Sequence, residues 1–203
     1  MASAKISGLV TDIFEPAEEI AGRRYTKFIL RNKRFSGTCD VMPCYIAKSN
    51  LGDIAVGKYI EVSGRIKTIN KDIDGKKRLL IFCLVDEVSE FKDYLNQVRC
   101  EGNLCKAPVH RTTPNGLEIC DLIIAINDDD GSSYLPSIAW GKYSFIASQL
   151  KVGDAIVANG RLQSREYKKK IDDATYEVRT AYELSASMID VVEESEEIDE
   201  SSN

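Results

Sequence analysis

The sequence predicts an all-β protein made of two tandem copies of one small five-stranded barrel, followed by an acidic tail. Three observations support this prediction. Two thirteen-residue stretches, VGKYIEVSGRIKT from Val56 and VGDAIVANGRLQS from Val152, share five residues at a constant offset of 96 positions. Both halves contain segments in which apolar and polar residues alternate with the period of a β-strand. Gly, Pro, Asn and Asp separate these segments, as expected of turns between short strands.

The repeat length indicates two domains. A period near 95 residues exceeds the roughly 20–50 residues of solenoid repeats and suits a small domain. We therefore expect a first domain over residues 1–88, a linker over 89–95 and a second domain over 96–192. Residues 190–203 hold seven acidic side chains and no basic one. Such a run buries too little apolar surface to fold, so residues 193–203 are expected to form a disordered acidic tail.

Each half is expected to contain five strands, with a short helix between the third and the fourth that is clearest in KYSFIASQL. Gly64 and Gly160 stand in the middle of the fourth strand, and such a glycine marks a bulge or a sharp bend at a barrel corner. This order of elements is that of an OB-fold, a partly open Greek-key barrel. The expected strands are Lys5–Ile13, Arg24–Arg31, Thr38–Ala47, Tyr59–Ile69 and Arg78–Val88, then Gln97–Lys106, Leu117–Asn127, Ser133–Trp140, Ala155–Tyr167 and Tyr176–Val191.

Composition indicates an ordinary globular chain, with 43% hydrophobic and 29% charged residues. No apolar run approaches the roughly 20 residues of a membrane span. The N-terminus also lacks the pattern of a secretion signal, so a cytoplasmic location is expected. The six cysteines are expected to be free thiols, because disulfides are rare in that compartment. Paired C-x-x-C hooks are absent and His110 is the single histidine, so no metal is expected.

Motifs of catalysis are also absent from the sequence. There is no phosphate-binding G-x-x-x-x-G-K-[ST] loop and no G-x-S-x-G elbow. The acidic group Asp128–Asp130 is interpreted as a polar hairpin turn, with a metal site as the alternative. We therefore expect no enzymatic activity and no cofactor.

Aromatic residues interleaved with cations on strand faces point to nucleic-acid binding. In SYLPSIAWGK, period 2 places Tyr134, Ile138 and Trp140 on one face, with Leu135 and Ala139 on the other, in the barrel interior. Bases stack on such rings at about 1–3 kcal/mol each, while cations follow the phosphates. The candidates in the second half are Tyr134, Trp140, Tyr167, Arg161, Arg165, Lys168, Lys169 and Lys170.

The second half resembles the bacterial single-stranded-DNA-binding protein family. The similarity runs from NQVRCEGNL through APVHRTTPNG and SIAWGKYSFIASQLKVGDAIVANGRLQSREY to YEVRTAYELSASMI. It implies that bases stack on Tyr134, Trp140 and Tyr167. A further stacking aromatic of the family would fall in NDDDG, where this chain has Asp. The family's acidic C-terminus ends in an apolar tip that docks replication and repair enzymes, whereas this chain ends ESSN.

The first half keeps the same skeleton with a weaker version of the motif. Its aromatic candidates are Phe35 in RNKRFSG and Tyr45 in MPCYIAK. Its loop NKDIDGKKR corresponds to the loop between the fourth and fifth strands, which often grips the bound strand in OB-folds. The basic candidates are Arg31, Lys33, Arg34, Arg65, Lys67, Lys76, Lys77 and Arg78.

These observations predict a protein that binds single-stranded DNA largely independently of sequence, in replication, repair or recombination at the nucleoid. The resemblance implies that a homodimer would present four barrels. An OB-fold module that holds other proteins of a primosome or recombination complex is an alternative, and so is an RNA binder, which would use the same stacking. Structural explanations also remain open: Trp140 as a core residue, exposed tyrosines in cross-strand pairs, and lysines at solvated hairpin tips.

Overall fold

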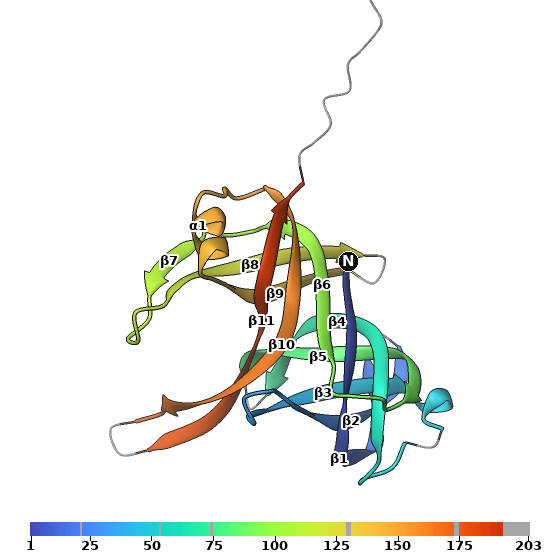
Figure 1. Ribbon diagram of the computed structural model, residues 1–203. Coiled ribbons are helices and arrows are strands. Elements are labelled where there is room, and N and C mark those ends of the chain that lie inside the picture. The colour runs from blue at the N-terminus through green and yellow to red at the C-terminus, as the bar shows by residue number, and fades with distance from the viewer. Residues whose placement is uncertain (21, 53, 74, 129–130, 173–174, 193–203) are drawn as a thin grey trace, which may run out of the picture.

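The computed structural model describes residues 1–192 apart from 21, 53, 74, 129–130 and 173–174. The acidic tail expected at 193–203 lies outside the described residues. Within them, eleven strands form one continuous sheet in the order β2-β3-β5-β4-β1-β6-β10-β11-β9-β8-β7 (Figure 1). No helix of this part of the chain is long and apolar enough to cross a membrane.

The first half closes into a five-stranded barrel, because β1 pairs with both β2 and β4. Parallel pairing of β3 with β5 completes the ring. A single 3-10 turn, Lys48–Asn50, stands where the sequence predicts a helix, and this corrects that expectation for the first half. The strands are β1 Ala2–Ile20, β2 Arg23–Lys33, β3 Cys39–Ala47, β4 Tyr59–Ile73 and β5 Lys76–Glu90.

The second half closes in the same way, because β6 pairs with both β8 and β10 while β11 runs parallel to β9. The short strand β7, which the sequence analysis did not predict, pairs with β8. Together, β6 and β7 correspond to the single long strand β1 of the first barrel. A segment containing Pro108 separates β6 from β7, because proline lacks the N–H that strand pairing uses. The elements are β6 Asn96–Leu104, β7 Val109–Thr112, β8 Glu118–Asp128, β9 Gly131–Trp140, α1 Lys142–Ser148, β10 Ala155–Lys170 and β11 Tyr176–Val191.

An approximate two-fold axis relates the two barrels. Strands β1 and β6 occupy equivalent positions and pair antiparallel, with Ala4 opposite its equivalent Val98. Local contacts repeat on both sides of this axis: the N–H of Gly57 donates to the carbonyl of Val10 at 2.9 Å, and the N–H of Gly153 donates to the carbonyl of Leu104 at 2.8 Å. The repeated stretches of sequence therefore fold into equivalent structures, joined along the seam between β1 and β6.

The two mid-strand glycines lie at bulges, as predicted. The strand register shifts between Ser63 and Gly64 in β4, and between Asn159 and Gly160 in β10. A Cβ atom on Gly160 would lie 2.1 Å from the carbonyl oxygen of Ser185 on β11. Glycine is therefore required where the neighbouring backbone approaches this closely.

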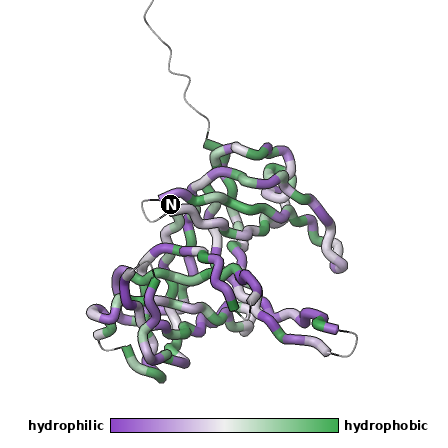
Figure 2. The backbone as a smooth tube through the Cα atoms, turned by 180° about the vertical axis from the view of Figure 1, so that it is seen from behind, coloured by the Kyte–Doolittle hydropathy of each residue, from purple (hydrophilic) through white to green (hydrophobic). Residues whose placement is uncertain are grey.

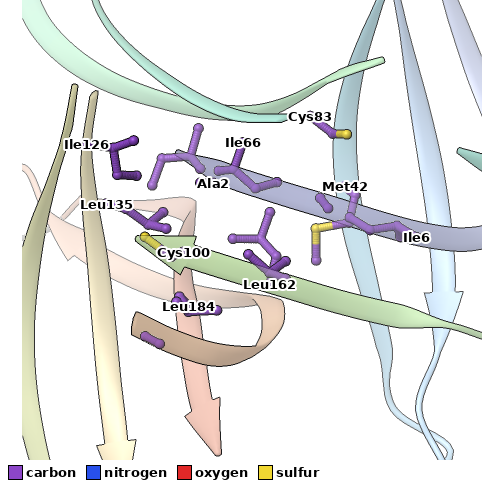
Figure 3. Packing of buried hydrophobic residues seen from close by; sticks show 14 of the residues in the cluster. Ala2, Ile6, Met42, Ile66, Cys83, Cys100, Ile126, Leu135, Leu162 and Leu184 are labelled. Atoms are coloured by element: carbon purple, nitrogen blue, oxygen red, sulfur yellow. The ribbon is translucent and has the colours of Figure 1, made fainter. Parts of the chain in front are cut away.

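The apolar core runs through both barrels. One cluster of buried side chains includes Ile6 and Ile66 of the first barrel as well as Ile126 and Leu162 of the second. Ala2 lies within the same cluster, between Ile126 of the second barrel and Met42 of the first in the view of Figure 3. The barrels consequently share buried apolar surface across the seam, and neither is an independent core.

The turn between β2 and β3 docks on β10 of the second barrel. The buried carboxylate of Asp40 accepts the N–H of Ser164 at 2.8 Å, and the N–H of Val41 donates to the hydroxyl of Ser164 at 2.8 Å. Asp40 also accepts two hydrogen bonds from the guanidinium of Arg34, the one from Nε at 2.6 Å. The buried carboxylate of Asp40 thus stabilises the β2–β3 turn and also attaches it to β10 of the second barrel.

The equivalent contact joins β9 to β4 on the other side of the axis. The N–H of Tyr134 donates to the hydroxyl of Thr68 at 2.8 Å, and the N–H of Thr68 donates to the hydroxyl of Ser133 at 3.2 Å. Beside them, Nζ of Lys67 donates to the two carboxylate oxygens of Asp128 at 2.6 and 2.7 Å. The two barrels therefore hold each other by reciprocal contacts.

Candidate nucleic-acid interface

The outward face of β9 carries the aromatic residues that the strand period predicts. Tyr134 is 46% exposed, whereas Leu135 and Ala139 are fully buried in the barrel. Trp140 is half-buried, and its indole N–H donates to the hydroxyl of Ser185 at 3.0 Å. This hydrogen bond fixes the edge of the ring at the barrel surface, which is not the placement of a sealed core tryptophan.

Trp140 lines a groove of about 950 Å³ that crosses the seam between the barrels. Three cations line the same groove: Lys5 on β1, Arg99 on β6 and Arg161 on β10. Lys5 and Arg99 each contact an acidic neighbour, Glu61 at 2.9 Å and Glu101 at 2.6 Å. The groove therefore combines an aromatic ring with guanidinium and ammonium groups, as stacking and phosphate contact require.

Arg161 is the least neutralised of these cations. Its Nη2 donates to Oε1 of Gln163 at 3.1 Å, while its buried Nε has no hydrogen-bond partner among the described residues. Burial, together with the nearby charge of Arg34, lowers the pKa of Arg161. Asp40 partly offsets this effect, and an anion bound at the guanidinium would supply a hydrogen-bond acceptor for Nε and a further opposite charge.

The outer part of the β10–β11 hairpin projects away from both barrels and is mostly hydrophilic (Figure 2). Tyr167 is 38% exposed on this arm and lies opposite Arg179 in the strand pairing. Arg165 and Lys169 share the face of Tyr167, because side chains alternate along β10. The three predicted lysines therefore do not share one face of the arm: Lys169 lies on the face of Tyr167, and Lys168 and Lys170 lie on the opposite face.

That opposite face holds an aromatic residue that the sequence analysis missed. Tyr176 is exposed and lies opposite Lys170 in the strand pairing. Its position at the start of a strand, directly after the lysine-rich turn, is a signal that could have identified it. Tyr167 and Tyr176 thus place one ring on each face of the arm.

The first barrel lacks two of the aromatic residues found on β9. The parallel pairings of β3 with β5 and of β9 with β11 fix which positions are equivalent. Val41 occupies the position of Tyr134, and Ala47 occupies the position of Trp140. A base could not stack on either of these small side chains, so the two barrels differ at this surface.

The third aromatic position differs as well. Lys71 of β4 stands where Tyr167 stands in β10. Its Nζ lies 2.8 Å from Oε2 of Glu18, and this hydrogen bond is the main cause that lowers the pKa of Glu18. The first barrel therefore has a paired cation in place of the third ring.

The structure corrects the expectation for Tyr45. The residue is only 4% exposed, its hydroxyl donates to Glu18 at 3.4 Å, and its ring centroid lies 4.7 Å from that of Phe82. Burial and the charge of Glu18 raise the pKa of Tyr45 to about 12. A ring held in this way has no face to offer to a base.

Two basic candidates of the first half are also placed elsewhere than expected. Lys67 is 8% exposed and contacts Asp128, and Arg34 is held by Asp40. Lys67 thus joins the two barrels and Arg34 neutralises Asp40 within the first barrel, which leaves both unsuited to following a phosphate chain. The contact of Asp128 with Lys67 likewise supports a structural role for that carboxylate, while Asp129 and Asp130 lie outside the described residues.

The other first-half candidates remain at the surface. Phe35 is fully exposed at the β2–β3 turn. Lys76 and Lys77 are exposed at the start of β5, and Arg65 lies 3.7 Å from Asp86. These residues stay compatible with a nucleic-acid surface.

Comparisons with known proteins connect this geometry to one family. The family described as "Single-strand binding protein family" matches residues 95–192. The single-stranded DNA-binding protein of Thermus aquaticus is 30% identical over 146 residues, which cover 61% of this chain and 55% of the relative. That of Thermus thermophilus is 23% identical over 145 residues, covering 61% and 54%. The chain thus spans about half the length of the curated relatives it matches.

The fold itself is similar over almost the whole chain. The crystal structure of the wild-type single-stranded DNA binding protein from Thermus aquaticus superimposes with a TM-score of 0.75 at 20% identity. The similarity covers 96% of this chain and 94% of the other. It therefore extends to the first barrel, where the family match does not reach.

Proposed function

We propose that the chain is a member of the single-strand binding protein family, which matches residues 95–192, and that it binds single-stranded DNA largely independently of sequence. One observation carries the proposal: Trp140 lies in an open groove beside Arg161, whose Nε has no partner among the described residues. An unpaired nucleotide has a base, which can stack on the ring of Trp140, and a phosphate, which can contact the cation Arg161. Stacking and phosphate contact supply affinity without selecting a base.

Each part of the surface has a distinct role in this proposal. Tyr134, Trp140 and Tyr167 provide ring faces, while Arg161, Arg165 and Lys169 lie near the path of the phosphates. Because such contacts release counterions, affinity should fall steeply as salt rises. The second barrel supplies the stacking rings, and the first barrel adds the exposed Lys76 and Lys77.

The setting of this activity is part of the same proposal. A homodimer would bring four barrels together, and replication or repair proteins would be its partners. The location would be cytoplasmic, at the nucleoid. Strands exposed during replication, repair or recombination are the DNA that such an assembly would cover.

Trp140→Ala is expected to weaken binding of oligo-dT by about tenfold or more, because one stacked base contributes about 1–3 kcal/mol. Trp140 is the single tryptophan of the chain, so quenching of its emission by oligo-dT measures binding of the unmodified protein directly. The variant is measured by anisotropy of labelled DNA, with oligo-rU in parallel to compare RNA.

Phe145→Ala serves as the control, because Phe145 is an exposed ring on α1 beside His110. It should bind oligo-dT as the wild type does. Absence of quenching and of anisotropy change in the wild type at low salt would refute DNA binding and favour a module that holds other proteins.

A further inference from the structure

The linker between the barrels is a fixed part of the surface. The hydroxyl of Ser7 on β1 donates to the carbonyl of Asp93 at 2.6 Å and accepts the N–H of Leu95 at 2.6 Å. The side-chain amide of Asn32 donates to the carbonyls of Ser7 and Leu95 at 2.7 and 2.8 Å. Both Ser7 and Asn32 are buried beneath this segment. Residues 91–95 therefore lie in a set position across β1.

This anchoring presents a group of aromatic rings. The ring centroid of Phe91 lies 5.1 Å from that of Tyr59 and 5.3 Å from that of Tyr94. The centroids of Tyr59 and Tyr94 are 6.3 Å apart. Tyr59 nevertheless remains 48% exposed. The three rings support one another at the surface and do not enter the core.

A fourth ring lies across a groove from this group. Phe35, at the β2–β3 turn, and Tyr94 line the same groove of about 630 Å³. Phe35 is fully exposed, so its ring contributes no burial to the fold. Its hairpin is held against β10 by Asp40, so Phe35 is carried on a docked element.

The groove of Phe35 adjoins the groove of Trp140. Asn96 and Arg161 line both. Lys33 adds a cation at the Phe35 end, and Asp93 adds a carboxylate that accepts the N–H of Tyr94 at 2.7 Å. Arg161, whose Nε has no hydrogen-bond partner among the described residues, thus lines two grooves that each contain at least one aromatic side chain.

We propose that Phe35 and Tyr94, supported by Tyr59 and Phe91, form a second stacking platform for single-stranded DNA, reached from Trp140 past Arg161. This inference rests on the proposed function. The shared lining residue Arg161, the cation Lys33 and the nearby Trp140 groove favour an unpaired nucleic-acid strand as the occupant. The platform gives the first barrel a stacking surface although Val41 and Ala47 replace the rings of β9.

The test compares two lengths of oligo-dT. An oligomer of about 8 nucleotides fits within the roughly 4–16 nucleotides that one OB-fold covers, whereas one of about 35 exceeds it. Affinity of the double variant Phe35→Ala, Tyr94→Ala for the long oligomer is expected to fall about thirtyfold or more, because two stacking faces of about 1–3 kcal/mol each are lost. The short oligomer should bind unchanged, since it occupies the Trp140 groove alone. Phe145→Ala is the matched control and should alter neither affinity.

A second measurement detects the contact directly. Oligo-dT carrying photoreactive 5-iodouracil is irradiated with the wild-type chain, and crosslinked peptides containing Phe35 or Tyr94 are expected by mass spectrometry. Thermal unfolding should show the double variant folded, because Phe35 is fully exposed and Tyr94 is a partly exposed residue outside the core cluster.

The outcomes separate this inference from the function on which it rests. Unchanged affinity for the long oligomer and no crosslink at either residue would overturn the platform, while quenching of Trp140 would still uphold DNA binding. An equal loss for both oligomers would also overturn it, because that loss would place the effect in the Trp140 groove. If the wild type binds neither oligomer, the platform and the proposed function both fail.

Discussion

Asp40→Ala is expected to lower the free energy of unfolding by about 3–5 kcal/mol, the usual effect of removing one partner of a buried ion pair. Asp40 is fully buried, and it accepts hydrogen bonds from the Arg34 guanidinium and from the N–H of Ser164 on the other barrel. Its removal leaves a partly buried cation and a backbone donor without an acceptor. Urea unfolding followed by Trp140 emission measures the loss.

Asp12→Ala provides the comparison for this variant. Asp12 is an exposed carboxylate on β1, so its removal should change the free energy of unfolding by no more than about 0.5 kcal/mol. A similar small change for Asp40→Ala would contradict the conclusion that this carboxylate holds the β2–β3 turn on β10.

The barrel plan could be predicted because its signals are local. Alternation along a strand is visible within a few residues, and Gly64 and Gly160 mark bulges in the same place in both halves. Equivalent turns, each with a glycine at positive φ at Gly57 and Gly153, precede these strands. Such features depend on near neighbours in the chain, which the sequence displays directly.

The joining of the barrels could not be predicted in the same way. The pairing of Ala4 with Val98 and the contact of Lys67 with Asp128 connect residues far apart in sequence. No local pattern encodes which outward face meets another strand. For this reason the sequence suggested Lys67 as a DNA contact, whereas in the fold its ammonium group forms an ion pair between the barrels.

The same difference between local patterns and long-range contacts decides which parts of the candidate site could be predicted. Period 2 placed Tyr134 outward on β9 correctly, but it could not show that Tyr45 is covered by neighbouring strands and by Phe82. The rings of Phe91 and Tyr94 were missed because their segment was interpreted only as a linker. Two aromatics within EFKDYLN were the available signal.

Gly160→Ala is expected to destabilise the protein by about 3 kcal/mol, at the upper end of the usual cost of overpacking. The new Cβ would lie 2.1 Å from the carbonyl oxygen of Ser185, and backbone cannot move away as a flexible side chain can. Urea unfolding measures the effect. Ser187→Ala, on the paired strand, is the control and should stay within about 0.5 kcal/mol of the wild type.

Gly64→Ala extends this test to DNA binding. Its Cβ would lie 2.1 Å from the carbonyl oxygen of Leu84, so the loss of stability should match that of Gly160→Ala. Only Gly160 lines the Trp140 groove, next to Arg161. Gly160→Ala should therefore weaken oligo-dT binding under conditions where both variants are folded, while Gly64→Ala should not. Equal weakening by both would show that affinity follows global stability and not the local geometry of this groove.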